Sequence, residues 1–566
     1  MNSRQVRLSK GQLVVCAILG VSFGLGRNYL ATSTRAFNLT VVGCSVVAFL
    51  YFSLLFVVFD ALGESHRDFR LGPFSAVLSD AASPIRMALR VAGLLLACWL
   101  PYLLLMYPGN LSNDTTGQLT MFYTLMGHGE RWITAQHPVF DTLVFGAITY
   151  PFYAAGHFRL GVFVCIFLQE LLTAASFGVA FVWIKRRLNV SSGLVALVLG
   201  FMALCPIVPI MVCSLSKDTF FSWVYLVWLV FFSDCVVTGH VDKRHFVVLA
   251  VSGALMVLTK KYGFFVAVLS LIVLAISFAL KKGRRSAPAS LLLVAVVGFA
   301  YGVCLPLLSA VTDASPAYRA DTLIVPVQQV AMAYSRYPED FSSEDLETVS
   351  QFVGIATIDS GNWYQTNSDT IKIIGDLSIP GGFTDEQVAR FLDVWVRMGL
   401  KHPGAYVDGW LTLESPLFTF ETFLPMFDSE WHTWADPNVI PDVCFDKAEP
   451  FAQLSVQIND WYSWLVAVPV LKLFLAPSLY ALIIPAYFLA GVLRRKKALL
   501  PVLAPVIVTF LGLLISPMVQ PNPETMRYLM PFVYATPVLL CMVWSRAEAP
   551  RGERCPGLDG ADTQVA

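Results

Sequence analysis

Residues 246–280 read FVVLAVSGALMVLTKKYGFFVAVLSLIVLAISFAL, two apolar runs separated by Lys260 and Lys261. An α-helix needs about 20 apolar residues to cross a hydrocarbon core about 30 Å thick; the second run has about that length, and the first is shorter. Lipid offers the backbone no hydrogen bonds, so a helix, which satisfies its own backbone groups, is the expected structure. This stretch therefore predicts two membrane-spanning helices joined by a short turn that carries both lysines.

The composition of the whole chain agrees with that interpretation. Its 566 residues are 56% hydrophobic and only 14% charged, with a mean hydropathy of +0.64, which excludes an ordinary soluble globular protein. The formal net charge is zero, so no basic surface indicates nucleic acid as a partner. We expect an all-α polytopic membrane protein in contact with membrane lipids.

Similar apolar runs recur along the chain and predict about twelve transmembrane helices. The expected spans are 12–31, 38–60, 87–106, 160–184, 190–212, 220–237, 245–259, 262–280, 287–308, 464–491, 499–517 and 528–545. Clusters of Lys and Arg between spans mark the cytoplasmic side, because cytoplasmic loops carry an excess of these residues. The clusters lie within 67–86, 185–187, 243–244, 281–285 and 494–497.

One apolar stretch does not fit this alternation. Residues 138–155 are apolar enough to cross, but a crossing there would place the basic cluster at 185–187 outside. We therefore interpret them as a re-entrant or half-membrane element on the outer side, which is tolerable where protein covers its backbone. A kinked span is the alternative.

These assignments divide the chain into five parts. They are an N-terminal two-span hairpin with its cytoplasmic loop (1–86), a transmembrane core (87–308) with a first extracytoplasmic loop (107–137), an extracytoplasmic module (309–463), C-terminal transmembrane helices (464–545) and a disordered cytoplasmic tail (546–566). Capping-box patterns at Ser342 with Asp345 and at Thr384 with Gln387 predict that the module is mostly helical, with IPGGF (379–383) as a loop.

The first extracytoplasmic loop carries the main catalytic candidate. In YPGNLSNDTTGQ (107–118), a Pro-Gly pair ends a span, and Asp114 precedes a short helix that contains Gln118. A carboxylate at a membrane edge is partly desolvated, which raises its proton affinity and makes it a better general base. The alternative is that Asp114 caps a helix beginning at Thr115.

Three further ionisable residues are candidates of lower rank. His137 stands before a proline at the start of the half-membrane element and faces Asp114 across one loop, where a structural turn is the alternative. Glu170 lies near the middle of the span 160–184, so it is a functional candidate, or equally a hydrogen-bonded structural residue. His402, which follows an amphipathic helix, is interpreted as mainly structural.

Charged residues at the outer ends of other spans favour an anionic partner. Lys217 and Asp218 begin one such span, where they either act on a substrate or are a salt-bridged or snorkelling pair at the interface. Lys260 and Lys261 lie outside against the usual bias, which favours an anionic group such as a lipid phosphate. Arg527, at the start of the last span, has a side chain suited to bidentate phosphate contact.

Together these pieces resemble the GT-C superfamily of polytopic glycosyltransferases, and within it bacterial membrane proteins with a YPG, D, Q and HP pattern in the first loop. The matching stretches are YPGNLSNDTTGQ, QHPVFDT, SKDTFF, KKYGFF, KHPGAY and MRYLMPF. The resemblance implies transfer of a sugar from a polyprenyl-phosphate donor to a glycan, lipid or protein acceptor. The enzyme would serve the cell envelope, as a multi-pass protein of the plasma membrane with its active site facing outside.

The resemblance also implies roles for individual residues. Asp114 would act as general base toward the acceptor hydroxyl, and Asp218 would orient the substrate or a metal. Lys260, Lys261 and Arg527 would offset the charge on the departing phosphate. His137 completes the set of candidate catalytic residues. The remaining candidates for substrate binding are Gln118, Lys217, Tyr262 and Tyr528. A second tier of site candidates consists of Asn113, Glu170 and His402.

A metal requirement stays open. Several branches of the superfamily carry paired acidic residues in the first loop, but here Asn113 stands beside Asp114. A divalent metal ion is therefore a candidate cofactor rather than an expected one, and no other cofactor is expected.

Two other kinds of function fit the same sequence. A transporter or flippase of lipid-linked glycans would use the same basic residues, but transporters usually concentrate polar groups near the middle of the membrane. Here the ionisable groups gather at the outer face, and only Glu170 is expected to lie deep, which favours the enzyme. A non-catalytic assembly protein whose outer module binds a partner is the third reading.

Overall fold

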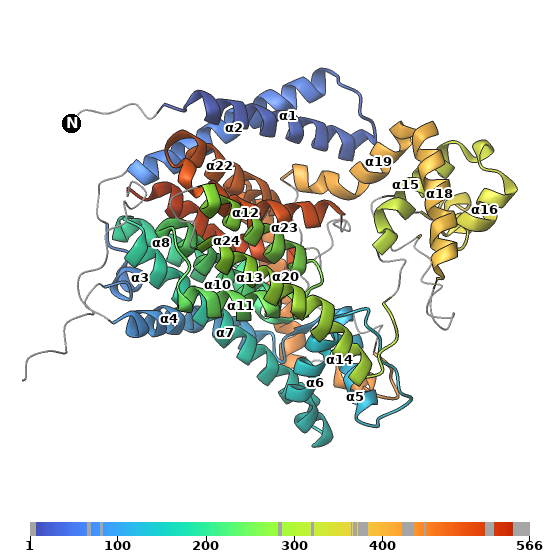
Figure 1. Ribbon diagram of the computed structural model, residues 1–566, viewed down its shortest axis with the longest axis horizontal. Helices are drawn as coiled ribbons and strands as arrows, with labels where there is room; N and C mark the ends of the chain where they lie inside the picture. Colours follow the sequence, from blue (N-terminus) through green and yellow to red (C-terminus); the bar gives the residue numbers. More distant parts are fainter. Residues whose placement is uncertain are drawn as a thin grey trace, which may run out of the picture.

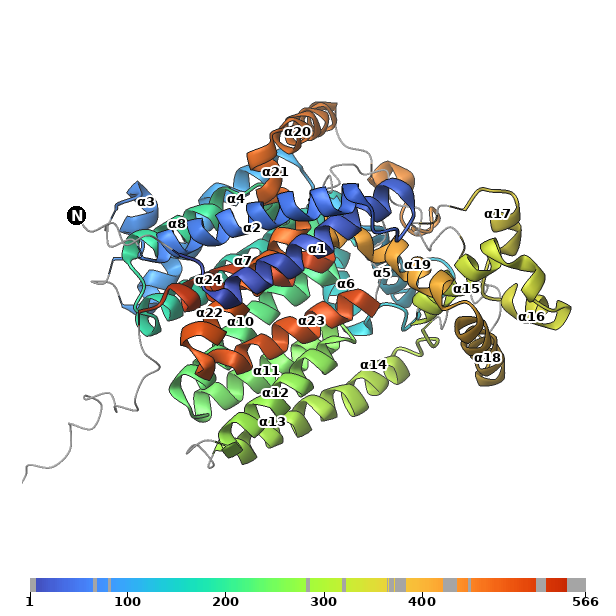
Figure 2. The same cartoon turned by 90° about the horizontal axis from the view of Figure 1, so that it is seen from above.

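The computed structural model describes residues 7–64, 69–79, 83–280, 286–317, 322–363, 365, 371, 383–420, 435–445, 449–515 and 526–546. Within these ranges the chain is almost entirely helical, with one sheet of two short strands. Figures 1 and 2 show a bundle of long helices from which a smaller helical module, built around α15–α19, projects at one end. The predicted all-α class is confirmed.

Nine helical stretches in the described part of the chain are long and apolar enough to cross a membrane. They are α1 (Lys10–Thr32), α2 (Leu39–Glu64), α4 (Pro84–Leu105), α7 (Phe158–Arg187), α10 (Lys217–Thr238), α12 (Gly263–Leu280), Ala287–Val311 (α13, η2 and α14), Lys497–Ile515 (η10 and α23) and α24 (Met526–Trp544). The bent pair α21 (Pro469–Leu475) and Leu479–Arg495 (η9 and α22) makes ten if it counts as one span. The protein is thus a multi-pass membrane protein, and a total of twelve crossings stays a prediction.

Two of the predicted spans are interrupted helices. The stretch 190–212 divides into α8 (Ser192–Leu204) and α9 (Ile207–Val212), because Pro206 between them has no backbone N–H to continue the helix. The stretch 464–491 bends by 66° between α21 and η9. The Sγ of Cys205 contacts the carbonyl oxygen of Phe474 at 3.8 Å, so the two interruptions lie against each other.

The bundle has two chemically different ends. Helix α10 begins at Lys217, and near its other end Asp234 pairs with Arg187, which closes α7 (Nε to Oδ1, 3.1 Å). Lys496, after α22, donates to the carbonyl oxygen of Met542 near the end of α24 (3.0 Å). The basic clusters at 185–187 and 494–497 therefore share the end away from Lys217, as the charge pattern predicts. The cluster at 281–285 lies outside the described residues, as does the tail from 547 onward.

Helix α6 (Val139–Ala154) corresponds to the stretch interpreted as a half-membrane element. It joins α7 through a tight turn, and a Cβ at Gly161 of α7 would meet the backbone of Thr149, so the two helices form an antiparallel hairpin. With 16 residues α6 rises about 24 Å, short of a full crossing, whereas the 30 residues of α7 rise about 45 Å. This geometry agrees with a half-membrane element, and the membrane boundary itself stays a prediction.

The projecting module has a hydrophobic core of its own, separate from that of the bundle. Its described helices are α15 (Ile324–Arg336), η4 (Pro338–Asp340), α16 (Ser343–Val349), α17 (Ile355–Asp359), α18 (Asp385–Lys401), α19 (Pro403–Glu414) and η7 (Ser415–Phe418). Both predicted capping boxes are present, at the starts of α16 and α18. The mostly helical module is confirmed over these residues, and all but the last residue of the predicted IPGGF loop lies outside them. Helix α20 (Glu449–Ala467) runs across the boundary predicted at residue 463, so that boundary falls inside a helix.

The N-terminal helices α1 and α2 pack along each other over the outside of the bundle (Figures 1 and 2). Their contact depends on glycine, because a Cβ at Gly24 would lie 2.8 Å from the carbonyl oxygen of Val41 and closer still to the hydroxyl of Ser45. The helix backbones therefore approach more closely than any larger residue would allow.

Replacing Gly24 with leucine should separate α1 from α2 and lower the stability of the purified protein, measured by its thermal unfolding midpoint in detergent. Overpacking of this kind costs about 1–3 kcal/mol. The matched control is Gly43→Leu on α2, because a Cβ at Gly43 meets nothing within 4 Å. Equal unfolding midpoints for the two variants would show that the close approach of the helices at Gly24 does not contribute to stability.

Candidate functional site

The site begins with two copies of one short sequence. Residues 111–115 read LSNDT and residues 215–219 read LSKDT, which share the pattern Leu-Ser-X-Asp-Thr. The strands that lead into them, β1 (Asn110–Leu111) and β2 (Ser214–Leu215), pair in parallel with Asn110 opposite Ser214 and Leu111 opposite Leu215. The register of the pairing thus matches the register of the two sequence copies.

Each copy starts a helix in the same way. Ser112 accepts a hydrogen bond from the backbone N–H of Thr115 at the start of α5 (Asn113–Leu125), and Ser216 accepts one from Thr219 at the start of α10. The helix therefore begins at Asn113 with Ser112 as its cap, and the alternative that Asp114 caps a helix beginning at Thr115 is wrong. The Asp114 side chain is left for other contacts.

Asp114 is paired with cations from two distant parts of the chain. Its Oδ2 lies 2.8 Å from the Nζ of Lys217 and 3.0 Å from the Nη2 of Arg527, at the start of α24. The Nε2 of His137 is 3.9 Å from Oδ1, and its Nδ1 lies 2.7 Å from the same Lys217 Nζ. Because Lys217 can only donate, Nδ1 accepts, and a neutral His137 carries its proton on Nε2, toward Asp114.

Asp218 forms the second half of the same ion cluster. It pairs with Lys260, the residue after α11 (Lys243–Thr259), and its Oδ2 lies 3.5 Å from the Nε of Arg527. The Nζ of Lys260 lies over the rings of Tyr262 and Tyr528, 4.8 and 4.5 Å from their centroids, in cation–π geometry. Lys217 and Asp218 are therefore not paired with each other, and each forms a salt bridge with a residue from another part of the chain.

The cluster is buried and has an excess of positive charge. Three cations, Lys217, Lys260 and Arg527, face two ionised carboxylates, and the side chains of Arg527 and Asp218 are only 8% and 1% exposed. The N-termini of α5 and α10 open beside these groups, and each adds a partial positive charge from its helix dipole. The arrangement suits an anion, because a buried excess charge is costly until it is neutralised.

The charges also decide the protonation of the two titratable groups of the first loop. Burial alone would raise the pKa of Asp114, but Arg527 and Lys217 outweigh it and hold the pKa well below its usual range. Burial, followed by the charge of Lys217, lowers the pKa of His137 to about 3. The expectation that the membrane edge raises the proton affinity of Asp114 is therefore wrong for this arrangement, because attraction by the cations exceeds the effect of desolvation.

A third aspartate near the cluster was not among the sequence candidates. Asp141, in the first turn of α6, is fully buried, and neither oxygen has a hydrogen-bond partner among the described residues. Lys217, Asp218 and Lys260 are near enough to interact with it electrostatically. The signal in the sequence was its position one helical turn after His137, which places both residues at the same end of α6.

Other sequence candidates lie outside the ion cluster. Gln118 is buried between α5 and α6, where it donates to the hydroxyl of Thr142 (3.3 Å). Lys261 is exposed and donates to the carbonyl oxygen of Ala135, two residues before His137 (3.0 Å). Asn113 stands at the first turn of α5, where its carbonyl oxygen accepts from the hydroxyl of Thr116.

The contacts of neighbouring residues show where Glu170 lies, and the contacts of His402 show its role. Gln169, next to Glu170, donates to the carbonyl oxygen of Ser214 in β2 (3.0 Å), so Glu170 lies level with the start of α10, and its depth in the membrane stays a prediction. Its carboxylate is fully buried without a hydrogen-bond partner among the described residues. His402 binds Asp340 (2.7 Å) and stacks on Tyr337 within the module, which agrees with a structural role.

The residues of the cluster do not fit a metal ion. Among the described residues, no group of three or more His, Cys, Asp and Glu side chains is arranged to hold one. Both aspartates of the cluster already have lysine or arginine partners, and these cations would repel a further positive charge.

The fold and the site define a multi-pass helical membrane protein with a buried, cation-rich ion cluster at one end of its bundle. The chain belongs to DUF6020, a family of unknown function whose model matches residues 123–555. His137, Lys217, Asp218, Lys260 and Arg527 lie within the matched residues, whereas Asp114 precedes them. No curated protein matches the chain.

The neutral His137 should make stability depend on pH. Below about pH 6.5 the unfolded chain binds a proton on this histidine, whereas the folded protein does so only near pH 3, so stability falls as the pH falls through that window. The loss is at most about 1.4 kcal/mol per pH unit. Thermal unfolding midpoints between pH 7.5 and 5.0 should therefore fall less steeply in His137→Gln than in the wild type.

The matched control for this series is His157→Gln, because His157 is exposed at the start of α7. It should keep the wild-type dependence on pH. If the unfolding midpoint of His137→Gln falls with pH as steeply as that of the wild type, His137 does not stay neutral in the folded protein.

Proposed function

We propose that the protein is a glycosyltransferase of the GT-C type, which moves a sugar from a polyprenyl-phosphate donor to an acceptor on the outer side of the plasma membrane. The observation that carries the proposal is the ion cluster, in which two aspartates stand among three largely buried cations at a single end of the bundle. That end lies away from the basic clusters, and the positive-inside rule then makes it the extracytoplasmic end. Nucleotide-linked sugars are scarce there, whereas a lipid carrier delivers its sugar at the membrane surface.

The cations give the donor phosphate its binding site. Arg527 and Lys217 each offer hydrogen-bond donors that are now directed at Asp114, and the N-termini of α5 and α10 add their dipoles. A phosphate that takes up these donors would neutralise the excess positive charge of the cluster. Lys260 and Lys261 lie on the same side and would offset further charge as the phosphate departs.

Donor binding would also change the chemistry of Asp114. The carboxylate is a weak base while Arg527 and Lys217 hold its pKa low, and it regains proton affinity when the phosphate attracts those cations. In the transfer step, Asp114 accepts the proton of the acceptor hydroxyl, whose oxygen bonds to the anomeric carbon. The bond from that carbon to the phosphate oxygen breaks, and its electron pair leaves with polyprenyl phosphate.

Positioning within the site would fall to the neighbouring groups. His137 directs Nε2–H toward Asp114, and Asp218 holds Lys260 with one carboxylate oxygen and Arg527 with the other. Because its partners are cations, Asp218 orients substrate by way of those cations and not through a metal. Tyr262 and Tyr528 keep Lys260 between their rings.

The alternative is a transporter or flippase of lipid-linked glycans, and one observation favours it. Paired interrupted helices near the middle of a bundle are common in transporters, and here the interruptions at Pro206 and after Leu475 touch. The cavity of about 530 Å³ beside them, however, is lined by apolar residues such as Phe201 and Leu475. The charged groups that would act on a substrate stand at the end of the bundle, which favours the enzyme.

Purified protein in lipid vesicles should release or transfer sugar from a radiolabelled polyprenyl-phosphate sugar pool. Asp114→Asn should lower the rate about 100-fold or more, because a general base contributes about 10²–10⁴ to such a step. The control is Asp393→Asn on the exposed face of α18, which should retain the wild-type rate. Equal rates for Asp114→Asn and the wild type would remove Asp114 from the base role.

The same vesicles distinguish the transporter. If the wild type moves a fluorescent lipid-linked sugar between leaflets while the sugar stays attached to its phosphate, the transferase proposal is wrong and the flippase is supported.

A further inference from the structure

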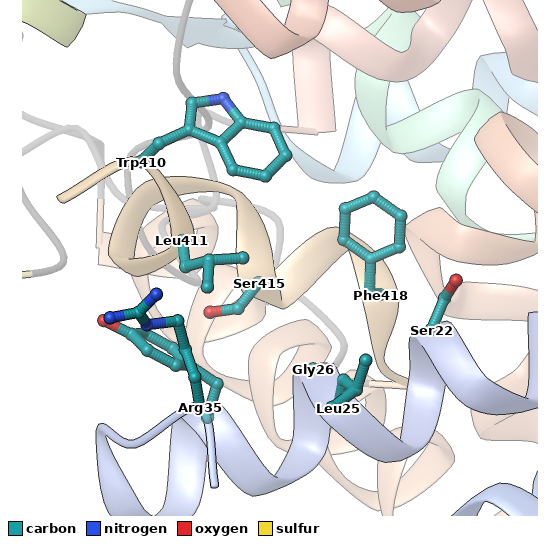
Figure 3. A pocket seen from close by; sticks show the side chains of 9 residues that line it. Ser22, Leu25, Gly26, Arg35, Trp410, Leu411, Ser415 and Phe418 are labelled. Carbon is teal, nitrogen blue, oxygen red and sulfur yellow. The ribbon is translucent and has the colours of Figure 1, made fainter. Parts of the chain in front are cut away.

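A second feature, unrelated to the ion cluster, lies where the N-terminal hairpin meets the module. A half-open cavity of about 190 Å³ lies between α1 and the segment formed by α19 and η7. Figure 3 shows Leu25 of α1, Arg35 after it, and Trp410, Ser415 and Phe418 of the module segment around this space. None of these residues belongs to the proposed transferase site.

The cavity follows the outer half of a membrane-spanning helix. The 23 residues of α1 rise about 34 Å, close to the thickness of a bilayer core. Gln12, at its start, lies 3.5 Å from Arg494, so that start is at the end of the bundle with the basic clusters. The cavity therefore runs from Ser22, midway along α1, to Arg35 just beyond its far end, at the level of a lipid headgroup.

The polar groups of the cavity are incompletely satisfied. Asp408 pairs with Arg35 (Nε to Oδ1, 2.7 Å) and with Arg336 (Nη1 to Oδ2, 2.5 Å), so two arginines share one carboxylate. The Arg35 side chain is 46% exposed. The Ser415 hydroxyl is fully buried and has no partner among the described residues.

We propose that this cavity binds a phospholipid of the surrounding bilayer, with the lipid phosphate on Arg35. The distribution of polarity matches such a molecule, because the cation stands at the interfacial end and the apolar Leu25 and Phe418 line the part nearer the membrane centre. Trp410, which donates to the carbonyl oxygen of Leu514 at the end of α23 (3.1 Å), provides the aromatic wall usual at the interface.

The bound lipid would fasten three parts of the chain together. Arg35 belongs to the connection between α1 and α2, Trp410 and Ser415 to the module segment, and Leu514 to the C-terminal bundle. Occupancy should therefore stabilise the folded protein, and the stabilisation should grow with the logarithm of the lipid concentration once that concentration exceeds the Kd.

The test measures thermal unfolding of the full-length protein in a neutral detergent with three additives. These are phosphatidylglycerol, a diacylglycerol with the same chains, and inorganic phosphate. Phosphatidylglycerol should raise the midpoint by about 3 °C or more, while the other two leave it unchanged. Native mass spectrometry of the same sample should show phosphatidylglycerol retained on the protein.

Two variants locate the effect. Ser22→Trp fills the cavity without touching the pair of Arg35 with Asp408, and Arg35→Gln removes the phosphate contact. In both variants, phosphatidylglycerol should no longer raise the unfolding midpoint. The effect is measured as the difference between the midpoints with and without lipid, so that any change in basal stability cancels. Val14→Trp, on an exposed part of α1 away from the cavity, should keep the full rise.

Three results would overturn the proposal. A rise retained by both Ser22→Trp and Arg35→Gln would place the lipid elsewhere. An equal rise with inorganic phosphate would indicate a simple anion site, and an equal rise with diacylglycerol would indicate apolar filling without phosphate recognition. All three outcomes are independent of whether the protein transfers sugars.

Discussion

The parallel pairing of β1 with β2 is the constraint on which the site depends. Two residue pairs join the strands, and the next residues, Ser112 and Ser216, cap helices that start side by side. An aspartate follows in the first turn of each helix, where the helix dipole favours a negative charge. Two carboxylates more than a hundred residues apart in the chain are thus brought to the same place, and the cations of Lys217, Lys260 and Arg527 gather around them.

Such a cluster is expensive to bury. Each charge loses its hydration, and removing one partner of a buried pair typically costs about 3–5 kcal/mol because the other is left uncompensated. Apolar residues of similar volume would often be at least as stable there. The excess of cations over carboxylates adds to the cost, and it is the feature that a bound anion would relieve. A cluster of this kind is better explained by binding than by stability.

Much of the architecture was accessible from the sequence. Apolar run lengths located the long helices, the two capping boxes located α16 and α18, and the distribution of Lys and Arg correctly grouped the basic ends. The members of the ion cluster are all predicted from their positions at or near span ends, whereas Asp141 beside the cluster is not. The repeated Leu-Ser-X-Asp-Thr pattern was also present in the sequence, and it is the one local signal that could have paired the two loops in advance.

What the sequence by itself determined is therefore what local chemistry determines: helix length, helix caps and the side on which charges stand. Only the tertiary structure decided that Lys217 binds Asp114 and not its neighbour Asp218, that Glu170 lies level with β2, and that two spans are interrupted where they touch. It also decided that the pKa of Asp114 is lowered by its cationic partners and not raised by desolvation. The reason is that partners, depth and pKa depend on groups distant in the chain, whose distances are set when the helices pack.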